Sequence, residues 1–188
     1  MKKSVRFRTV AATFFTFCAM GLSACSNGED RSSLVTGNLA TAEEMIDAFY
    51  SFDASKLEPF LLNAGESKQS ILGYQGWAEG GNYLVVSRAP CVAESKAVIS
   101  CAITVQDDPV LALETDFNVT DTFHITFSET IITKVDTSSN DQPIYYEARE
   151  WVEENMPEIF EGPCKRTEGI RDSPGDCARA ITEGYRQF

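Results

Sequence analysis

The stretch Val119–Phe127, VTDTFHITF, decides the fold because its residues alternate in polarity. Its odd positions are mostly apolar, and its even positions hold three threonines and His124. Successive side chains of a strand point to opposite faces, so this period of two predicts a strand with one buried face. The turn at residues 128–130 and the apolar run Ile131–Val135 predict that the chain returns as a hairpin.

More strands are predicted before this hairpin. Tyr83–Arg88 and Ala97–Val105 are rich in Val and Ile, which favour the extended backbone. Asp107-Asp108-Pro109 ends the second of them, and we expect Val110–Leu113 to form a short edge strand. Thr137–Pro143, which follows the hairpin, is polar and predicts a loop.

Helical patterns lie on both sides of these strands. Thr41 and Glu44 form a capping-box pattern, which predicts a helix beginning at Thr41. The other expected helices are Ser55–Leu62, Ser67–Glu79, Tyr145–Asn155 and Cys177–Phe188. Helices, then a strand meander, then helices again indicate an α+β fold, with helices packed on an antiparallel sheet.

This order of elements resembles the nuclear transport factor 2-like, or SnoaL-like, domains. The residues that carry the resemblance are the entry helix Glu43–Phe49, the strand Asp121–Phe127, its return at Ile131-Ile132, and Trp151-Val152 in the late helix. The resemblance covers roughly residues 40–160 and implies a cone-shaped, strongly curved sheet around a pocket, with the C-terminal helix as an addition. The superfamily includes isomerases, dehydratases, cyclases and non-catalytic binding domains. No local motif transfers a catalytic role to this chain.

The first 25 residues read as an export signal. Four basic residues precede an uncharged run, Val10–Leu22, that is too short to span a bilayer as a helix. Leu22-Ser23-Ala24-Cys25 then resembles the lipobox of bacterial lipoproteins. An ordinary secretory signal with a chance cysteine is the alternative.

The lipobox resemblance implies that residues 1–24 are a signal peptide and that Cys25 is the acylated N-terminus of the mature protein. We then expect residues 25–38 to be a flexible tether and residues 39–188 to be a single domain. The resemblance places the protein in the bacterial cell envelope. In a Gram-negative organism, Ser26 favours the outer membrane, facing the periplasm.

Charge restricts the partners. The chain has 16 Lys and Arg against 28 Asp and Glu, a net charge of −12. Removal of the signal, which has four basic residues and no acidic one, leaves 12 against 28, or −16. Such a chain is not expected to bind nucleic acid, and anionic lipid would repel it, so we expect the lipid to provide the membrane attachment.

Four cysteines remain beside Cys18 and Cys25, namely Cys91, Cys101, Cys164 and Cys177. An exported chain meets oxidising conditions, so two disulfides are expected. Three pairings are possible, and proximity in sequence favours Cys91–Cys101 and Cys164–Cys177. With one histidine and no C-x-x-C spacing, we expect no metal, and no phosphate-binding or dinucleotide motif predicts a cofactor.

Two polar residues of the central strand are candidates for chemistry. Asp121 lies on the otherwise apolar face, where desolvation would raise its pKa and suit it as a base. The interpretation we favour is a solvated or backbone-bonded carboxylate at the end of the strand. His124 lies on the opposite face and is expected at the surface.

The aromatic residues Phe49, Tyr50, Trp77, Phe123 and Trp151 could line a pocket, although core packing explains them equally well. The leading expectation is a non-catalytic domain that binds a small apolar or amphipathic ligand, or a protein. The alternatives are an isomerase, dehydratase or cyclase with Asp121 as base, and a structural or assembly module. The sequence leaves the oligomeric state open, and a dimer is possible.

Overall fold

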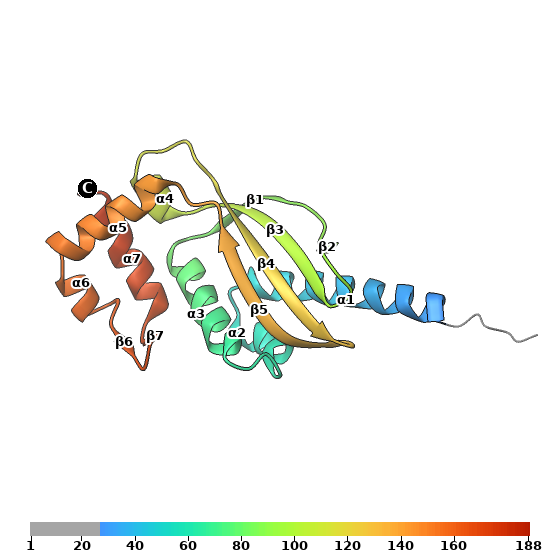
Figure 1. The fold of residues 1–188 in the computed structure, drawn as a ribbon. Coiled ribbons are helices and arrows are strands. Elements are labelled where there is room, and N and C mark those ends of the chain that lie inside the picture. Colours follow the sequence, from blue (N-terminus) through green and yellow to red (C-terminus); the bar gives the residue numbers. More distant parts are fainter. Residues whose placement is uncertain (1–26) are drawn as a thin grey trace, which may run out of the picture.

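An antiparallel sheet lies at the centre of the computed structural model, which describes residues 27–188. The strand order is β1-β3-β4-β5, and the short β2 pairs with β3 beside β1 (Figure 1). The bounds are Leu84–Arg88 for β1, Val92–Ala93 for β2, Val98–Gln106 for β3, Val119–Ser128 for β4 and Ile131–Ser139 for β5. The predicted hairpin is therefore confirmed as β4–β5, and β5 takes up Thr137–Ser139, which were expected in a loop.

The alternation of β4 is confirmed by burial. Its five odd-numbered side chains, Asp121 included, are buried, and the even-numbered ones before Ser128 are half-buried. The buried face meets three segments of the N-terminal half: α1 (Asn27–Phe49), α2 (Ala54–Leu57) and α3 (Ser67–Gly80) (Figure 1). Phe123 and Ile125 of β4 belong to the same apolar core as Met45, Ile46 and Phe49 of α1.

The helix α1 begins earlier than the sequence predicts. Its first residue is Asn27, so the capping box at Thr41 does not form, and the Thr41 hydroxyl donates instead to the carbonyl of Gly37, 3.1 Å away. Residues 27–38, assigned above to a tether, are helical, and the buried Asn38 amide donates to the carbonyl of Glu129 at 2.9 Å. Cys25 and the signal segment lie outside the described residues. None of the helices within residues 27–188 is both long and apolar enough to cross a membrane.

The segment after β3 is a helix and not the edge strand that we expected. The helix α4 spans Asp108–Ala112. The Asp107 carboxylate accepts a hydrogen bond from the amide of Val110 at 2.8 Å, and Pro109 lies in the first turn. An N-cap followed by proline starts a helix, and this local chemistry outweighs the apolar character of Val110–Leu113.

The C-terminal third forms a second layer at one end of the sheet. It contains α5 (Pro143–Asn155), α6 (Glu158–Glu161), the small hairpin β6 (Arg166–Thr167) and β7 (Ile170–Arg171), and α7 (Pro174–Tyr185) (Figure 1). The helix α7 meets α3 so closely that a Cβ atom on Gly80 would lie 2.2 Å from the carbonyl oxygen of Gly175. The fold is thus α+β, as predicted, with a C-terminal group of helices.

Both disulfides connect the cysteines that are close in sequence. Cys91 bonds to Cys101 with their Cα atoms 4.3 Å apart, and Cys164 bonds to Cys177 with 4.4 Å. The first bond continues the β2–β3 register, in which Val92 faces Ser100. The second joins the segment after α6 to the first turn of α7 and so fixes the β6–β7 hairpin between its ends.

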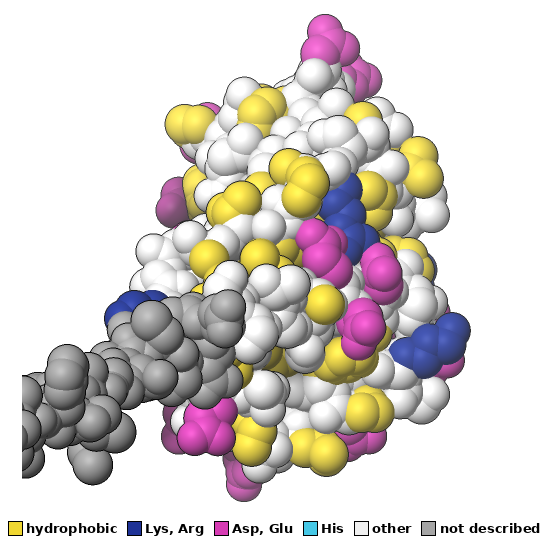
Figure 2. All heavy atoms as spheres, turned by 90° about the vertical axis from the view of Figure 1, so that its right-hand side faces the viewer, with side chains coloured by type: hydrophobic (Ala, Val, Ile, Leu, Met, Phe, Trp, Pro, Cys, Tyr) yellow, Lys and Arg dark blue, Asp and Glu magenta, His cyan; other side chains and the backbone are white. Residues whose placement is uncertain are grey.

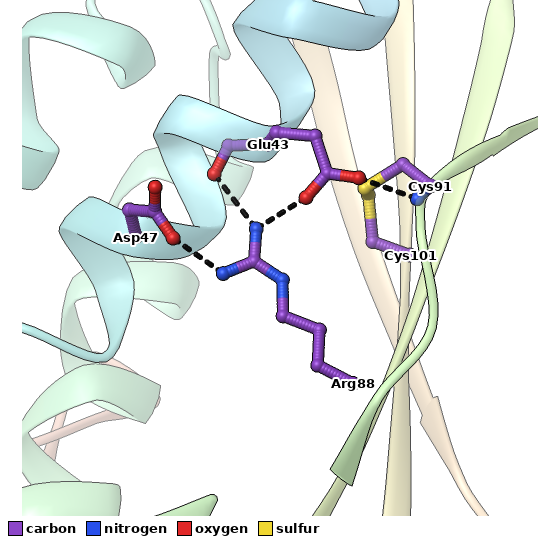
Figure 3. Close-up of a disulfide and its surroundings, with 5 residues drawn as sticks. All are labelled: Glu43, Asp47, Arg88, Cys91 and Cys101. Atoms are coloured by element: carbon purple, nitrogen blue, oxygen red, sulfur yellow. Dashed lines mark hydrogen bonds and ion pairs between the residues drawn. A yellow bond between two sulfur atoms is a disulfide. The ribbon is translucent and has the colours of Figure 1, made fainter.

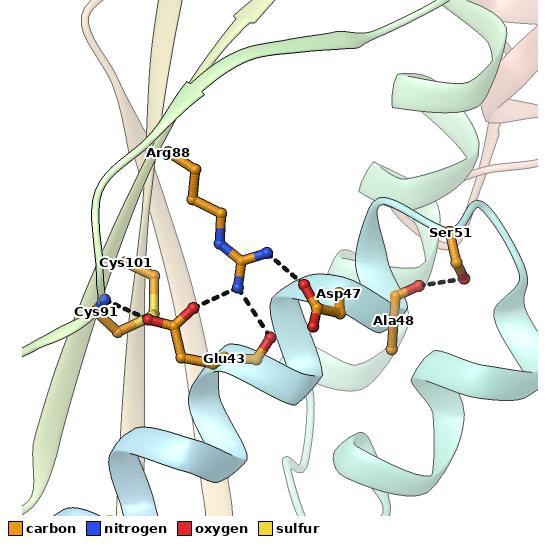
Figure 4. A network of polar contacts seen from close by, with 7 residues as sticks. All are labelled: Glu43, Asp47, Ala48, Ser51, Arg88, Cys91 and Cys101. Carbon is orange, nitrogen blue, oxygen red and sulfur yellow. Dashed lines mark hydrogen bonds and ion pairs between the residues drawn. A yellow bond between two sulfur atoms is a disulfide. The ribbon is translucent and has the colours of Figure 1, made fainter.

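A charged network connects α1 to the end of β1, next to the first disulfide. The Arg88 guanidinium forms ion pairs with Glu43 and Asp47, and it donates to the Glu43 carbonyl at 3.0 Å (Figure 3). The second Glu43 oxygen accepts the amide hydrogen of Cys91 at 2.6 Å. Figure 4 shows that Ser51 completes the end of α1 by donating to the Ala48 carbonyl. Every charge in this network has an opposite charge beside it.

Candidate functional site

A cavity of about 210 Å³ lies where the sheet meets the C-terminal layer. We call it the acidic cavity because three carboxyl groups line it, those of Asp107, Asp121 and Asp141. Its wall also contains Trp77, Val119, three serine and threonine residues of β5, and the tyrosines Tyr74, Tyr83 and Tyr145. A cavity of this size has room for roughly seven water molecules at the density of the liquid.

Asp121 occupies the acidic cavity because it is the second inward position of β4, opposite Ile103 of β3. Its side chain is only 2% exposed, so a solvated carboxylate is wrong, and no described backbone group forms a hydrogen bond with it as the other favoured alternative required. The Tyr74 phenol favours the charged form of this carboxyl and so acts to lower its pKa, but Oδ2 finds no donor among the described side chains. Burial raises the pKa of Asp121, Tyr74 acts in the opposite direction, the nearby Asp141 and Asp107 add to the rise, and the pKa lies at about 7.

Asp107 is the second buried carboxyl group of the acidic cavity. Its side chain is 2% exposed. The amide of the next residue, Asp108, donates to the Gly81 carbonyl at 2.8 Å and holds the start of α4 against the end of α3. The N-cap bond to Val110 leaves Oδ2 without a donor within residues 27–188. Burial raises the pKa of Asp107 to about 6, although the Val110 amide acts in the opposite direction.

Three tyrosines supply hydroxyl groups to the acidic cavity. Tyr74 comes from α3, Tyr83 from the turn between α3 and β1, and Tyr145 from α5. Burial raises the pKa of each phenol well above its ordinary value of 10. The three groups are therefore neutral hydrogen-bond donors and acceptors at physiological pH.

A second cavity, of about 300 Å³, shares Tyr74, Trp77 and Tyr145 with the first. We call it the arginine cavity because Arg149, Arg166 and Arg171 line it. The Arg171 guanidinium lies over the ring of Trp77, 5.1 Å from its centroid. Burial lowers the pKa of Arg171, and the positive charges of Arg166 and Arg149 lower it further.

The other predicted pocket residues occupy different places. Phe49, Tyr50 and Phe123 pack together in the core, with 4.8 Å between the ring centroids of Phe49 and Phe123. Trp151 contacts Phe188. Of the five aromatic candidates, Trp77 alone lines these two cavities.

His124 lies on the opposite face of β4 from Asp121. Its Nδ1 is 3.1 Å from Glu94 and its Nε2 is 3.2 Å from Ser138. It is a partly exposed residue, as expected, and takes no part in the acidic cavity.

Sequence reasoning missed most of the acidic cavity. Asp107 could have been found through its N-cap position before Asp108-Pro109, which also would have predicted α4. Tyr74, Tyr83 and Tyr145 gave no signal, because they come from three separate elements that only the tertiary fold brings together. Asp121 was found by its place in the strand period.

The described part of the chain contains no group of three His, Cys, Asp or Glu side chains placed to hold a metal ion. What these side chains can do is exchange protons. A carboxyl group with a pKa near 7 changes its charge at neutral pH, and neutral phenols beside it can orient a polar molecule.

Comparisons with protein families, with curated proteins and with solved structures each find no match.

Proposed function

We propose that the domain binds a small polar molecule in the acidic cavity and that Asp121 transfers a proton to or from it. The observation that carries this proposal is a buried carboxyl group on the cavity wall, with one oxygen that no described residue satisfies. Burying such a group without a partner costs free energy. A bound molecule that donates a hydrogen bond, or that exchanges a proton, would offset this cost.

The pKa of Asp121 supports proton transfer. A general acid or base works best when its pKa is near the working pH, and burial brings Asp121 to about 7. A ligand with a carbonyl group could accept a hydrogen bond from a neighbouring tyrosine while Asp121 removes a proton from the adjacent carbon. This is the isomerase, dehydratase or cyclase type of chemistry that the resemblance to nuclear transport factor 2-like domains implies, and α1–α3 against one face of the sheet agree with that resemblance.

We also propose that the protein works in the cell envelope, anchored by a lipid on Cys25. The lipobox Leu22–Cys25 and the export signal before it support this placement. The two disulfides support it too, because such bonds persist in oxidising compartments.

Hydrogen–deuterium exchange tests the proton transfer. The chain is incubated in D₂O with cyclopentanone, cyclohexanone or 3-methylbutan-2-one, which are small enough for the acidic cavity, and loss of the α-proton signal is followed by NMR. We expect exchange above the buffer rate that rises with pH through about 7. Asp121→Asn should slow it by about 10²- to 10⁴-fold.

Asp136→Asn is the matched control, because Asp136 is an exposed aspartate of β5 paired with Lys134. It should leave the exchange rate unchanged. Equal rates for the wild type and Asp121→Asn would contradict proton transfer. Ketone-induced shifts of amide resonances around Asp121 without exchange would instead establish the non-catalytic binding function.

An assembly role is the second candidate, and the edge strand β1 favours it. Leu84, Val85 and Val86 are exposed there, and edge strands pair readily with other strands. Light scattering across a range of concentrations decides: assembly through β1 predicts a dimer that Val86→Lys disrupts, whereas a monomer at every concentration would exclude it.

A further inference from the structure

The arginine cavity gathers positive charge in a strongly acidic protein. Arg149 comes from α5, Arg166 from β6 and Arg171 from β7, and all three line one cavity of about 300 Å³. We propose that this cavity is a binding site for a small oxyanion, the carboxylate, phosphate or sulfate group of a soluble molecule. Proton transfer by Asp121 is not needed for this site, which lies beyond the function proposed above.

The three arginines lack acidic partners among the described side chains. Elsewhere in the described chain, most basic side chains form ion pairs, among them Arg88 with Glu43 and Asp47, Arg179 with Asp176, Arg186 with Glu183, and Lys68 with Glu58. Among residues 32–188, whose side chains the structure describes, no carboxylate lies within ion-pair distance of Arg149, Arg166 or Arg171. The chain has 28 acidic residues, so a shortage of carboxylates does not explain why these arginines form no ion pair.

The three arginines also repel one another electrostatically. Burial lowers the pKa of Arg171, and the positive charges of Arg166 and Arg149 lower it further, as expected for three like charges around one cavity. Clustered like charges destabilise a fold unless an opposite charge compensates them. An anion in the cavity would provide that compensation.

The arginine cavity is built on fixed elements. The β6–β7 hairpin, which carries Arg166 and Arg171, lies between the two cysteines of the second disulfide. Arg171 is held over the ring of Trp77, and Arg166 donates to the carbonyl of Gly169 at 3.4 Å. Guanidinium groups present several N–H donors in a planar fork that matches carboxylate and phosphate oxygens.

The rest of the wall indicates the ligand's size. Trp77, Ile170 and Pro174 supply apolar surface beside the arginines, which suits an organic body attached to the anionic group. The volume equals that of roughly ten water molecules in the liquid. The expected ligand is therefore a small organic carboxylate, or a small phosphate or sulfate ester, rather than a polymer.

Anion titration of the full chain tests the site. Benzoate, phenyl phosphate and phenyl sulfate are added separately at constant ionic strength, and the Trp77 indole N–H resonance is followed by NMR. We expect a saturable shift with at least one of them below 10 mM, and the anion that binds most tightly identifies the preferred group. Arg166→Gln should weaken that binding at least 10-fold, and Arg149→Gln should do the same.

Arg186→Gln is the matched control, because Arg186 is exposed, pairs with Glu183 and does not line the cavity. It should leave the dissociation constant unchanged. Arg166 is exposed, so its variant should fold, and an unchanged urea midpoint would show that the loss is local. The proposal is overturned if none of the three anions gives a saturable shift, or if Arg166→Gln and Arg149→Gln bind as the wild type does. Neither result bears on deuterium exchange at Asp121, so the two proposals can fail separately.

Discussion

The two ends of the sheet differ in whether their charged side chains form ion pairs. Beside the first disulfide, Arg88 joins Glu43 and Asp47, and each charged group has an opposite partner (Figure 3). At the end covered by the C-terminal layer, Asp107 and Asp121 are buried without an ion pair to any described cation, and three arginines gather without one to any described carboxylate. On the face seen in Figure 2, acidic and apolar side chains intermingle and basic ones occur in few places.

This difference separates structural charges from those that we assign to binding. A paired network holds two elements together, and its charges satisfy one another. Buried or clustered charges without partners lower stability, and proteins keep them where activity requires them. The cavity end is therefore the end that we expect to bind ligands.

The largest effect is expected from Gly80→Ala, which perturbs the cavity end alone. The new methyl group would meet the backbone of Gly175 at 2.2 Å, so α3 and α7 must separate, and Tyr74 and Trp77 would move with α3. We expect a loss of about 3 kcal/mol or more in the free energy of unfolding, measured by urea denaturation.

Gly73→Ala is the control for this change. It lies in the same helix, where a Cβ atom would meet only Pro174 at 4.0 Å. Alanine in a helix is ordinarily more favourable than glycine by about 0.5–1 kcal/mol, so this variant should be at least as stable as the wild type. Equal stability of the two variants would show that α3 and α7 are not in close contact.

A smaller effect is expected from Arg88→Gln at the paired end. The change leaves the half-buried Glu43 without its cation, and we expect a loss of about 1–2 kcal/mol by urea denaturation. Binding of anions in the arginine cavity should not change. Arg186→Gln, which breaks an exposed ion pair, should lower the free energy of unfolding by less than about 0.5 kcal/mol. A larger loss from Arg186→Gln than from Arg88→Gln would contradict a structural role for the Arg88 network.

Local patterns predicted the elements better than they predicted the site. The period of two in Val119–Phe127 gave β4, and the short separations gave both disulfides, because each signal lies within one segment. The start of α1 could not be read from Thr41, because Asn38 is held by the distant carbonyl of Glu129.

Long-range packing also explains the error on Asp121. From the sequence, its position near the end of β4 suggested solvent. Tyr74 of α3 and Tyr145 of α5 line the cavity at that end in the folded chain, and no residue near Asp121 in the sequence predicts that they lie there. Arg149, Arg166 and Arg171 were missed for the same reason, since α5 and the β6–β7 hairpin meet only in the tertiary fold.

Stability measured against pH for the wild type and Asp121→Asn tests the central claim most directly. The folded pKa of Asp121 is about 7 and its ordinary value is 3.8, so between these values the folded chain binds the proton that the unfolded chain releases. The stability that this proton provides is complete below about pH 4 and is lost as the pH rises through 7. Because one pKa unit corresponds to about 1.4 kcal/mol, the wild type should lose up to about 4 kcal/mol through this group.

Asp121→Asn removes this loss while keeping the shape of the side chain. Asp107, whose folded pKa is about 6, gives both proteins a smaller decline in the same direction. We expect the variant to be the more stable protein by a few kcal/mol at pH 8 and the difference to vanish near pH 4. A variant that is less stable than the wild type at pH 8 would contradict it, because Asp121 would then be a satisfied structural charge like those around Arg88.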